Sequence, residues 1–267
     1  MDEKINLDLE DFSSEPFLDS LVKEIVEQDP KFLIGVFVAL AVVIITIVLL
    51  KFVFGTQTKR SNVLLVGLCD AGKTLLFSRL LAGRFTSTQT SISENSASYR
   101  TKNERGTTWT LVDLPGHESL RPQFLEKFKA SARAIVFVVD SAVFQKEVKD
   151  VAELLYSLLT DSVVTRNAPA LLIACNKQDV TMAKSAKLIQ QQLEKELNTL
   201  RMTRSAALTS QDGSDGTAVL YLGKRGKDFE FSQLPMKVEF VECSARGNKG
   251  GDEDADIEAL ERSLAKL

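Results

Sequence analysis

The stretch GLCDAGKT, at residues 67–74, constrains the fold more than any other part of the chain. It follows the short apolar run NVLLV and precedes LLFSRLL, whose apolar residues have helical spacing. Gly67 and Gly72 allow the backbone N–H groups to turn inward around an anion, while Lys73 reaches outer phosphates and the Thr74 hydroxyl ligates Mg²⁺. The positive end of the following helix points at the same anion. A strand, a glycine-bounded loop and a helix in this order predict a phosphate-binding site.

Apolar runs alternate with helical patterns along the rest of the chain. Apolar strands with helices between them predict an α/β fold with a mostly parallel central sheet covered by helices on both faces. The expected strands are Asn62–Val66, Thr108–Val112, Ala134–Val139, Ala170–Cys175 and Val238–Cys243, and the expected helices are Thr74–Leu81, Val148–Leu159, Ser185–Leu197 and Ile257–Lys266. We expect one globular domain over 62–267, interrupted by a solvated loop insert at 200–229.

A second motif, NKQD, points to the base of a nucleotide. Asn176, Lys177 and Asp179 end an apolar run, and ligands bind at the carboxyl ends of strands in α/β sheets. The Asp179 carboxylate can accept both hydrogens that guanine offers from N1 and N2. Adenine has no such pair and would leave a buried carboxylate without a partner. The motif therefore favours guanine.

Two shorter motifs complete the pattern. In DLPGH, Asp113 ends a strand and can hold Mg²⁺ through water, and the Gly116 N–H can meet a γ-phosphate. In ECSAR, Ser244 and Ala245 follow the last strand, where a backbone N–H can meet the guanine O6.

In this order the four motifs resemble those of small GTPases, over roughly Asn62 to Leu267. Among the small GTPases, the chain is most similar to the Arf and Sar branch. The resemblance implies GTP and Mg²⁺ as cofactors. The expected nucleotide-contacting residues are Gly67, Leu68, Cys69, Asp70, Ala71, Gly72, Lys73, Thr74, Leu75, Thr88, Gln89, Thr90, Ser91, Gly116, Asn176, Lys177, Asp179, Ser244 and Ala245.

The segment FTSTQTSISEN is the candidate first switch. The resemblance implies that Thr90 ligates Mg²⁺ together with Thr74 and a water-mediated Asp113, although spacing alone does not separate Thr90 from Ser91. A serine- and threonine-rich loop without a fixed role is the alternative.

His117, the single histidine, is the candidate catalytic residue. His117 directly follows Gly116 and stands at the position where most small GTPases carry a glutamine that orients the attacking water. A histidine can also position water, and a surface histidine without chemistry is the alternative. Arg121 and Arg133 are present, but nothing in the sequence places either at the γ-phosphate. Slow turnover is expected, and whether GTP is hydrolysed or stored stays open.

An uncharged apolar run, Phe32 to Leu50, predicts a transmembrane helix over 32–54. Basic residues follow it in the linker at 55–61, so the C-terminal side is expected in the cytosol and the acidic tail at 1–31 across the membrane.

The span combined with these motifs resembles the GTPase subunits of receptors that bring ribosomes carrying signal sequences to the endoplasmic reticulum membrane. That resemblance implies a heterodimer with the receptor's α subunit, with ribosome or translocon contacts left open. A net charge of -3 argues against direct nucleic-acid binding. The alternatives are a cycling vesicle-trafficking GTPase and a constitutive tether with GTP as a structural cofactor.

Overall fold

The computed structural model describes residues 38–47, 60–101, 106–210, 221–247 and 255–267. The chain divides into two compact units, Met1–Gln57 and Thr58–Leu267. In the first unit, 38–47 is a helix whose large apolar side chains are exposed. The rest of the expected span at 32–54, the tail at 1–31 and most of the linker lie outside the described residues. Among the residues that the structure describes, no helix combines the length and apolarity needed to cross a membrane.

The second unit is built on a six-stranded sheet with the order β2-β3-β1-β4-β5-β6. Its strands are β1 Asn62–Val66, β2 Asn95–Arg100, β3 Thr108–Asp113, β4 Ala132–Asp140, β5 Ala170–Asn176 and β6 Val238–Glu242. All neighbours are parallel except β2 and β3. The predicted mostly parallel α/β sheet is confirmed. The antiparallel edge strand β2 was not predicted.

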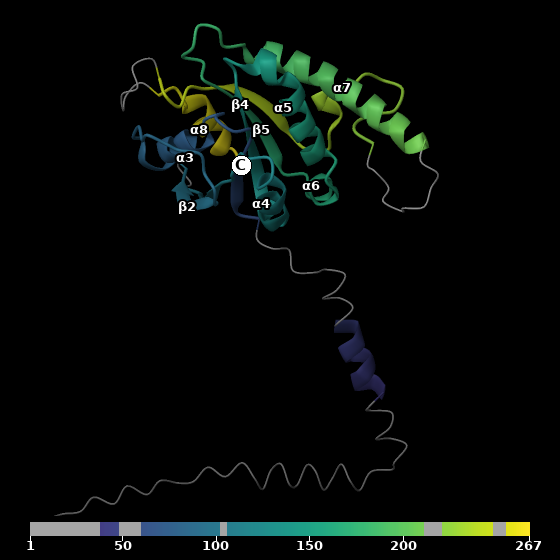
Figure 1. The fold of residues 1–267 in the computed structure, drawn as a ribbon. Helices are drawn as coiled ribbons and strands as arrows, with labels where there is room; N and C mark the ends of the chain where they lie inside the picture. Colours follow the sequence, from purple (N-terminus) through teal and green to yellow (C-terminus); the bar gives the residue numbers. More distant parts are fainter. Residues whose placement is uncertain (1–37, 48–59, 102–105, 211–220, 248–254) are drawn as a thin grey trace, which may run out of the picture. The chain divides into compact units, whose positions relative to one another are not determined.

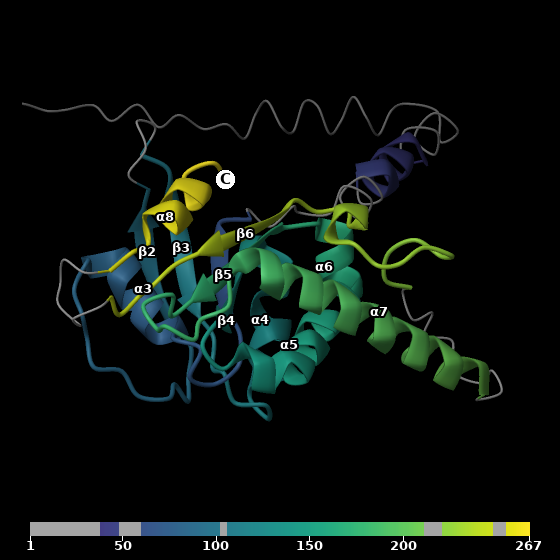
Figure 2. The same cartoon turned by 90° about the horizontal axis from the view of Figure 1, so that it is seen from above.

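Helices cover both faces of this sheet (Figures 1 and 2). They are α3 Lys73–Ala82, α4 Arg121–Phe128, α5 Phe144–Leu159, α6 Ser162–Asn167, α7 Ala186–Ser210 and α8 Glu258–Leu264, with 3-10 turns η1 Lys129–Ser131 and η2 Phe231–Gln233. Successive side chains of a strand point to opposite faces. Accordingly, Leu64 and Val66 pack in the core under α5 and α7, and Val63 and Leu65 pack in the core under α3 and α8.

The prediction of a solvated loop at 200–229 is wrong for the part of that segment that the structure describes. Helix α7 continues to Ser210, and the segment after 220 returns against it. Arg201, buried on α7, donates from Nη1 to the carbonyl oxygens of Leu222 and Lys224, at 3.3 Å each. Phe229 is buried in the core beneath this return. The polar composition of the insert concealed the buried Arg201 and Phe229.

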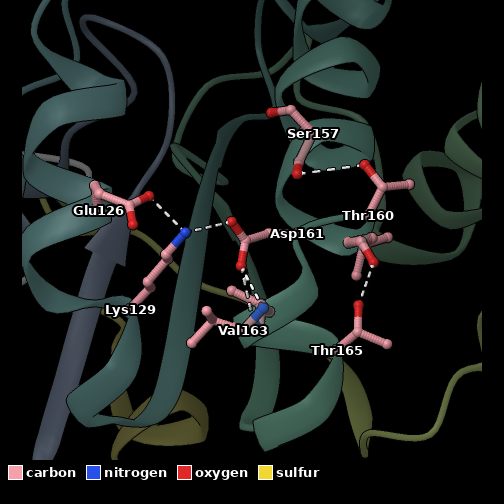
Figure 3. A network of polar contacts seen from close by, with 9 residues as sticks. Glu126, Lys129, Ser157, Thr160, Asp161, Val163 and Thr165 are labelled. Atoms are coloured by element: carbon pink, nitrogen blue, oxygen red, sulfur yellow. Dashed lines mark hydrogen bonds and ion pairs between the residues drawn. The ribbon is translucent and has the colours of Figure 1, made fainter. Parts of the chain in front are cut away.

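A polar network joins α4 and η1 to α6 (Figure 3). Asp161 is the N-cap of α6, and its Oδ1 accepts from the N–H groups of Val163 at 2.8 Å and Val164 at 3.0 Å. Lys129 donates to Asp161 Oδ2 at 2.7 Å and pairs with Glu126 at 2.5 Å. Burial opposes ionisation of Asp161, but the hydrogen bonds from Lys129 and the two amides outweigh it and hold the pKa of this carboxyl below its usual value.

Candidate nucleotide-binding site

The four motifs meet at the carboxyl edge of the parallel strands. The register pairs Leu65 of β1 with Asp113 at the end of β3, and Asp140 at the end of β4 with Asn176 at the end of β5. Parallel strands that end in register deliver the loops that follow them to one place. This edge is where α/β sheets bind ligands.

The loop after β1 requires glycine at both ends. A Cβ on Gly67 would lie 2.3 Å from the carbonyl oxygen of Val138, and one on Gly72 would lie 2.4 Å from Asn176 Nδ2. Gly72 also has a φ of 91° and is the N-cap of α3, with no side chain bonded to the helix end. The first N–H groups of α3 therefore remain available to an anion at the loop.

Lys73 folds back across this loop. Its Nζ donates to the carbonyl oxygen of Leu68 at 2.6 Å. A Cβ on Gly116 would lie 2.6 Å from the same Nζ and 2.9 Å from the Cys69 nitrogen, so only glycine lets the β3–α4 loop come this close. Burial lowers the pKa of the Lys73 ammonium, and the nearby Asp113 carboxylate opposes that shift. An anion bound between the loop and Gly116 would relieve the cost of burying the ammonium.

Asp113 is the centre of an oxygen-rich cluster. Its Oδ2 accepts from Thr74 Oγ1 at 2.8 Å and from Asn95 Nδ2 at 3.3 Å, and Ser91 Oγ lies 3.1 Å from Thr74 Oγ1. Burial raises the pKa of the fully buried Asp113, while the hydrogen bonds from Thr74 and Asn95 lower it. Its Oδ1 has no hydrogen-bond partner among the described residues. Two hydroxyls and a carboxylate with one oxygen to spare fit Mg²⁺, which prefers oxygen ligands.

The first-switch candidates line the same cavity as the loop. This cavity of about 380 Å³ is bordered by Cys69, Asp70, Gly72, Lys73, Thr74, Thr88, Gln89, Thr90, Ser91, Leu114 and Gly116. The structure brings Ser91 within hydrogen-bond reach of Thr74, whereas Thr90 lines the wall beside it. Metal ligation by Thr90 stays a prediction.

Asn176 joins the phosphate loop to the loop after β6. Its Nδ2 donates to the Ala71 carbonyl oxygen at 2.9 Å, and its Oδ1 accepts from the Ala245 N–H at 3.0 Å. Next to it, Ser244 Oγ donates to Asp179 Oδ1 at 2.5 Å, which orients the carboxylate expected to meet guanine. The residues of NKQD and ECSAR, each predicted to meet the guanine base, are therefore in contact with each other.

Two residues that position the site were missed by the sequence analysis. Asp140 accepts from Lys177 Nζ at 2.6 Å and holds the start of NKQD, in which Lys177 has a φ of 65°. The position of Asp140 at the end of an apolar run could have indicated that it belongs to the site. Arg79 of α3 is 1% exposed and donates from Nε to the Ala245 carbonyl oxygen at 2.8 Å. Nothing in its local sequence marks it as buried.

His117 and Leu75 are expected site residues that do not line the phosphate cavity. His117 is exposed, and its Nδ1 lies 2.8 Å from Ser119 Oγ and accepts weakly from the Ser119 N–H at 3.4 Å. Leu75 packs against the core cluster under α3 and α8, so any contact with a ligand would come from its backbone.

The fold and this arrangement of motifs define a small GTPase domain. The family model described as signal recognition particle receptor beta subunit matches residues 58–238, and the chain belongs to that family. The chain is 62% identical over 253 residues to the signal recognition particle receptor subunit beta of Mus musculus, covering 95% of this chain and 93% of the relative.

Solved structures agree with this assignment. "The Structure of the Mammalian SRP Receptor" contains a chain 63% identical to this one, with a TM-score of 0.67, covering 77% of this chain and 98% of that one. The receptor protein "SRb-GDP-Mg" from Chaetomium thermophilum is 26% identical, with a TM-score of 0.58, covering 79% of this chain and 99% of that one.

Proposed function

We propose that this chain is the GTP-binding subunit of the signal recognition particle receptor and holds the receptor's α subunit at the endoplasmic reticulum membrane for co-translational targeting. The observation that carries the proposal is the oxygen cluster of Asp113, Thr74 and Ser91 beneath the phosphate loop. It supports a site for Mg²⁺ and a nucleotide phosphate. The Chaetomium thermophilum relative, whose printed description includes GDP and Mg, adds support.

Each part of the nucleotide has a group in this chain suited to hold it. The N–H groups of the glycine-bounded loop and the Lys73 ammonium would bind the phosphates. Mg²⁺, when bound, would neutralise charge on the β- and γ-phosphate oxygens. Asp179, oriented by Ser244, would accept from guanine N1 and N2.

The site also suits a switch that a partner could sense. Residues 88–91 and Gly116 come from separate loops yet line one cavity with the phosphate loop. A γ-phosphate would draw both loops together, and its loss would release them. We propose that the receptor's α subunit binds the surface ordered in this way. The anchor would be the span expected at 32–54, with the domain at 62–267 in the cytosol, and ribosome or translocon contact stays a prediction.

The base assignment can be tested on the full chain in detergent with calorimetry. Asp179→Asn should weaken GTP binding about 10- to 100-fold, because a charge-assisted pair of hydrogen bonds is lost. Asp228→Asn is the matched control, since Asp228 is exposed and lies outside the cavity. Equal affinity of the wild type for ATP and GTP, or no binding of either, would refute the proposal.

Hydrolysis is a separate question within this proposal. We expect slow single-turnover cleavage of bound GTP in which His117 positions the water. His117→Ala should then slow cleavage without changing GTP affinity. Release of intact GTP from the wild-type chain after long incubation would instead support the constitutive tether. Rapid multiple turnover would support the cycling GTPase.

A further inference from the structure

A second cavity opens directly beyond the phosphate cavity. This groove of about 1030 Å³ is bordered by α4 and α5 and shares four lining residues with the phosphate cavity: Cys69, Asp70, Leu114 and Gly116. Arg121 lines the groove together with His117. The loops that carry the four shared residues therefore form a wall common to the groove and the phosphate cavity.

Arg121 is held in place through its backbone rather than through its guanidinium. It is the first residue of α4, and its N–H donates to the His117 carbonyl oxygen at 3.0 Å. The guanidinium makes no hydrogen bond or ion pair with any described residue, and Nη1 is buried without an acceptor. A buried donor on a cation is costly to leave unpaired, so an acceptor is expected there.

The charges around Arg121 indicate what kind of acceptor is missing. Burial lowers the pKa of its guanidinium, and the carboxylates of Glu118 and Asp150 lie within electrostatic range and oppose that shift. Its charge also contributes to the lowered pKa of Lys73, after the larger effects of burial. Two partly desolvated cations are thus within electrostatic range of each other, Lys73 in the lining of the phosphate cavity and Arg121 in the lining of the adjoining groove. A phosphate placed between them would be attracted by both and would relieve their repulsion.

We propose that Arg121 recognises the terminal phosphate of the bound nucleotide, with Nη1 as a donor to a γ-phosphate oxygen. The inference rests on the proposed GTP site and deepens it, because the chain then carries its own arginine for distinguishing a nucleoside triphosphate from a diphosphate. A guanidinium forms charge-assisted hydrogen bonds to phosphate oxygens. GDP lacks the group that Arg121 would contact.

The test compares affinities for a non-hydrolysable GTP analogue and for GDP, each with Mg²⁺, by calorimetry on the full chain in detergent. Arg121→Ala should weaken analogue binding about 10- to 100-fold and leave GDP binding unchanged. Arg133→Ala is the matched control. Arg133 is the second residue of β4, at the amino end of that strand, and it donates to the Leu267 carbonyl oxygen beside the Trp109 ring. It should alter neither affinity.

Each other outcome overturns the inference in a different way. Equal loss for both nucleotides, or a lower melting temperature of the nucleotide-free variant, would assign Arg121 to folding. Unchanged affinities with weaker binding of the α subunit would make it a partner contact. A wild-type chain that binds neither nucleotide would remove the proposed function as well. A wild type that binds both, with Arg121→Ala indistinguishable from it, would remove only this inference.

Discussion

Removal of the Arg79 side chain should be among the most damaging single changes in the domain. Arg79 is 1% exposed, and its bonds within the described part of the chain include three to carbonyl oxygens: Ala245 at 2.8 Å, Gly83 at 3.0 Å and Arg246 at 3.4 Å. A hydrogen bond from a charged donor contributes about 1.5–3 kcal/mol. Because the three bonds share one group and the last is long, we expect Arg79→Ala to cost about 4 kcal/mol rather than the full sum.

Thermal unfolding of the nucleotide-free chain measures this cost. For a domain of this size 1 kcal/mol shifts Tm by about 2–4 °C, so Arg79→Ala should lower Tm by about 8–16 °C. Arg84→Ala is the matched control, because Arg84 is exposed just beyond the same helix. If Arg79→Ala melted with the wild type, these bonds would contribute nothing net.

The same substitution should weaken nucleotide binding. Arg79 holds the Ala245 carbonyl oxygen while Asn176 holds the N–H of the same residue. Loss of the hydrogen bond from Arg79 should make the loop at Ala245, which is expected to meet the guanine O6, less rigid. Calorimetry below the lowered Tm should therefore show weaker GTP binding in Arg79→Ala than in Arg84→Ala.

Three further predictions concern the phosphate loop, the α6 cap and the thiols. The Cβ of Gly72→Ala would lie 2.4 Å from Asn176 Nδ2, and the backbone there has a φ of 91°. The substitution should therefore lower the free energy of unfolding in urea by about 1–3 kcal/mol and weaken GTP binding. Unchanged GTP affinity would contradict this prediction. Asp161→Ala should cost about 1 kcal/mol at pH 7. The pKa of Asp161 is lower in the folded chain than in the unfolded chain. The stability difference between wild type and variant should therefore be present at pH values above the unfolded pKa of about 3.9 and vanish as the pH falls through the folded pKa. GTP with Mg²⁺ should slow thiol labelling of Cys69, which lines the phosphate cavity, whereas burial should keep Cys175, with its pKa raised to about 12, unlabelled until unfolding.

Local patterns in the sequence were enough for most of the sheet and for the residue types of the site. Strands β1, β3, β4, β5 and β6 were predicted because each contains an apolar run, and the glycine-bounded loop and NKQD follow two of them. Strand β2 was missed since Tyr99 is its one fully buried side chain, which leaves no apolar period to detect. Helix α7 runs past its predicted end at Leu197, where Asn198 and Arg201 form hydrogen bonds with the segment that returns against the helix.

The sequence by itself was enough to predict the chemistry: a phosphate loop, a hydroxyl expected to bind Mg²⁺ and a carboxylate suited to guanine, each inferred from residues within a short stretch. Only the tertiary structure decided which of these groups meet. Arg79 reaches Ala245 across 166 positions, and Asn176 reaches Ala245 across 69. The spacing of apolar residues and of motif residues indicates only the burial and backbone geometry of residues that are near one another in the sequence. The choice of partner across the sheet edge depends on strand order and register, which arise only when the whole sheet has formed.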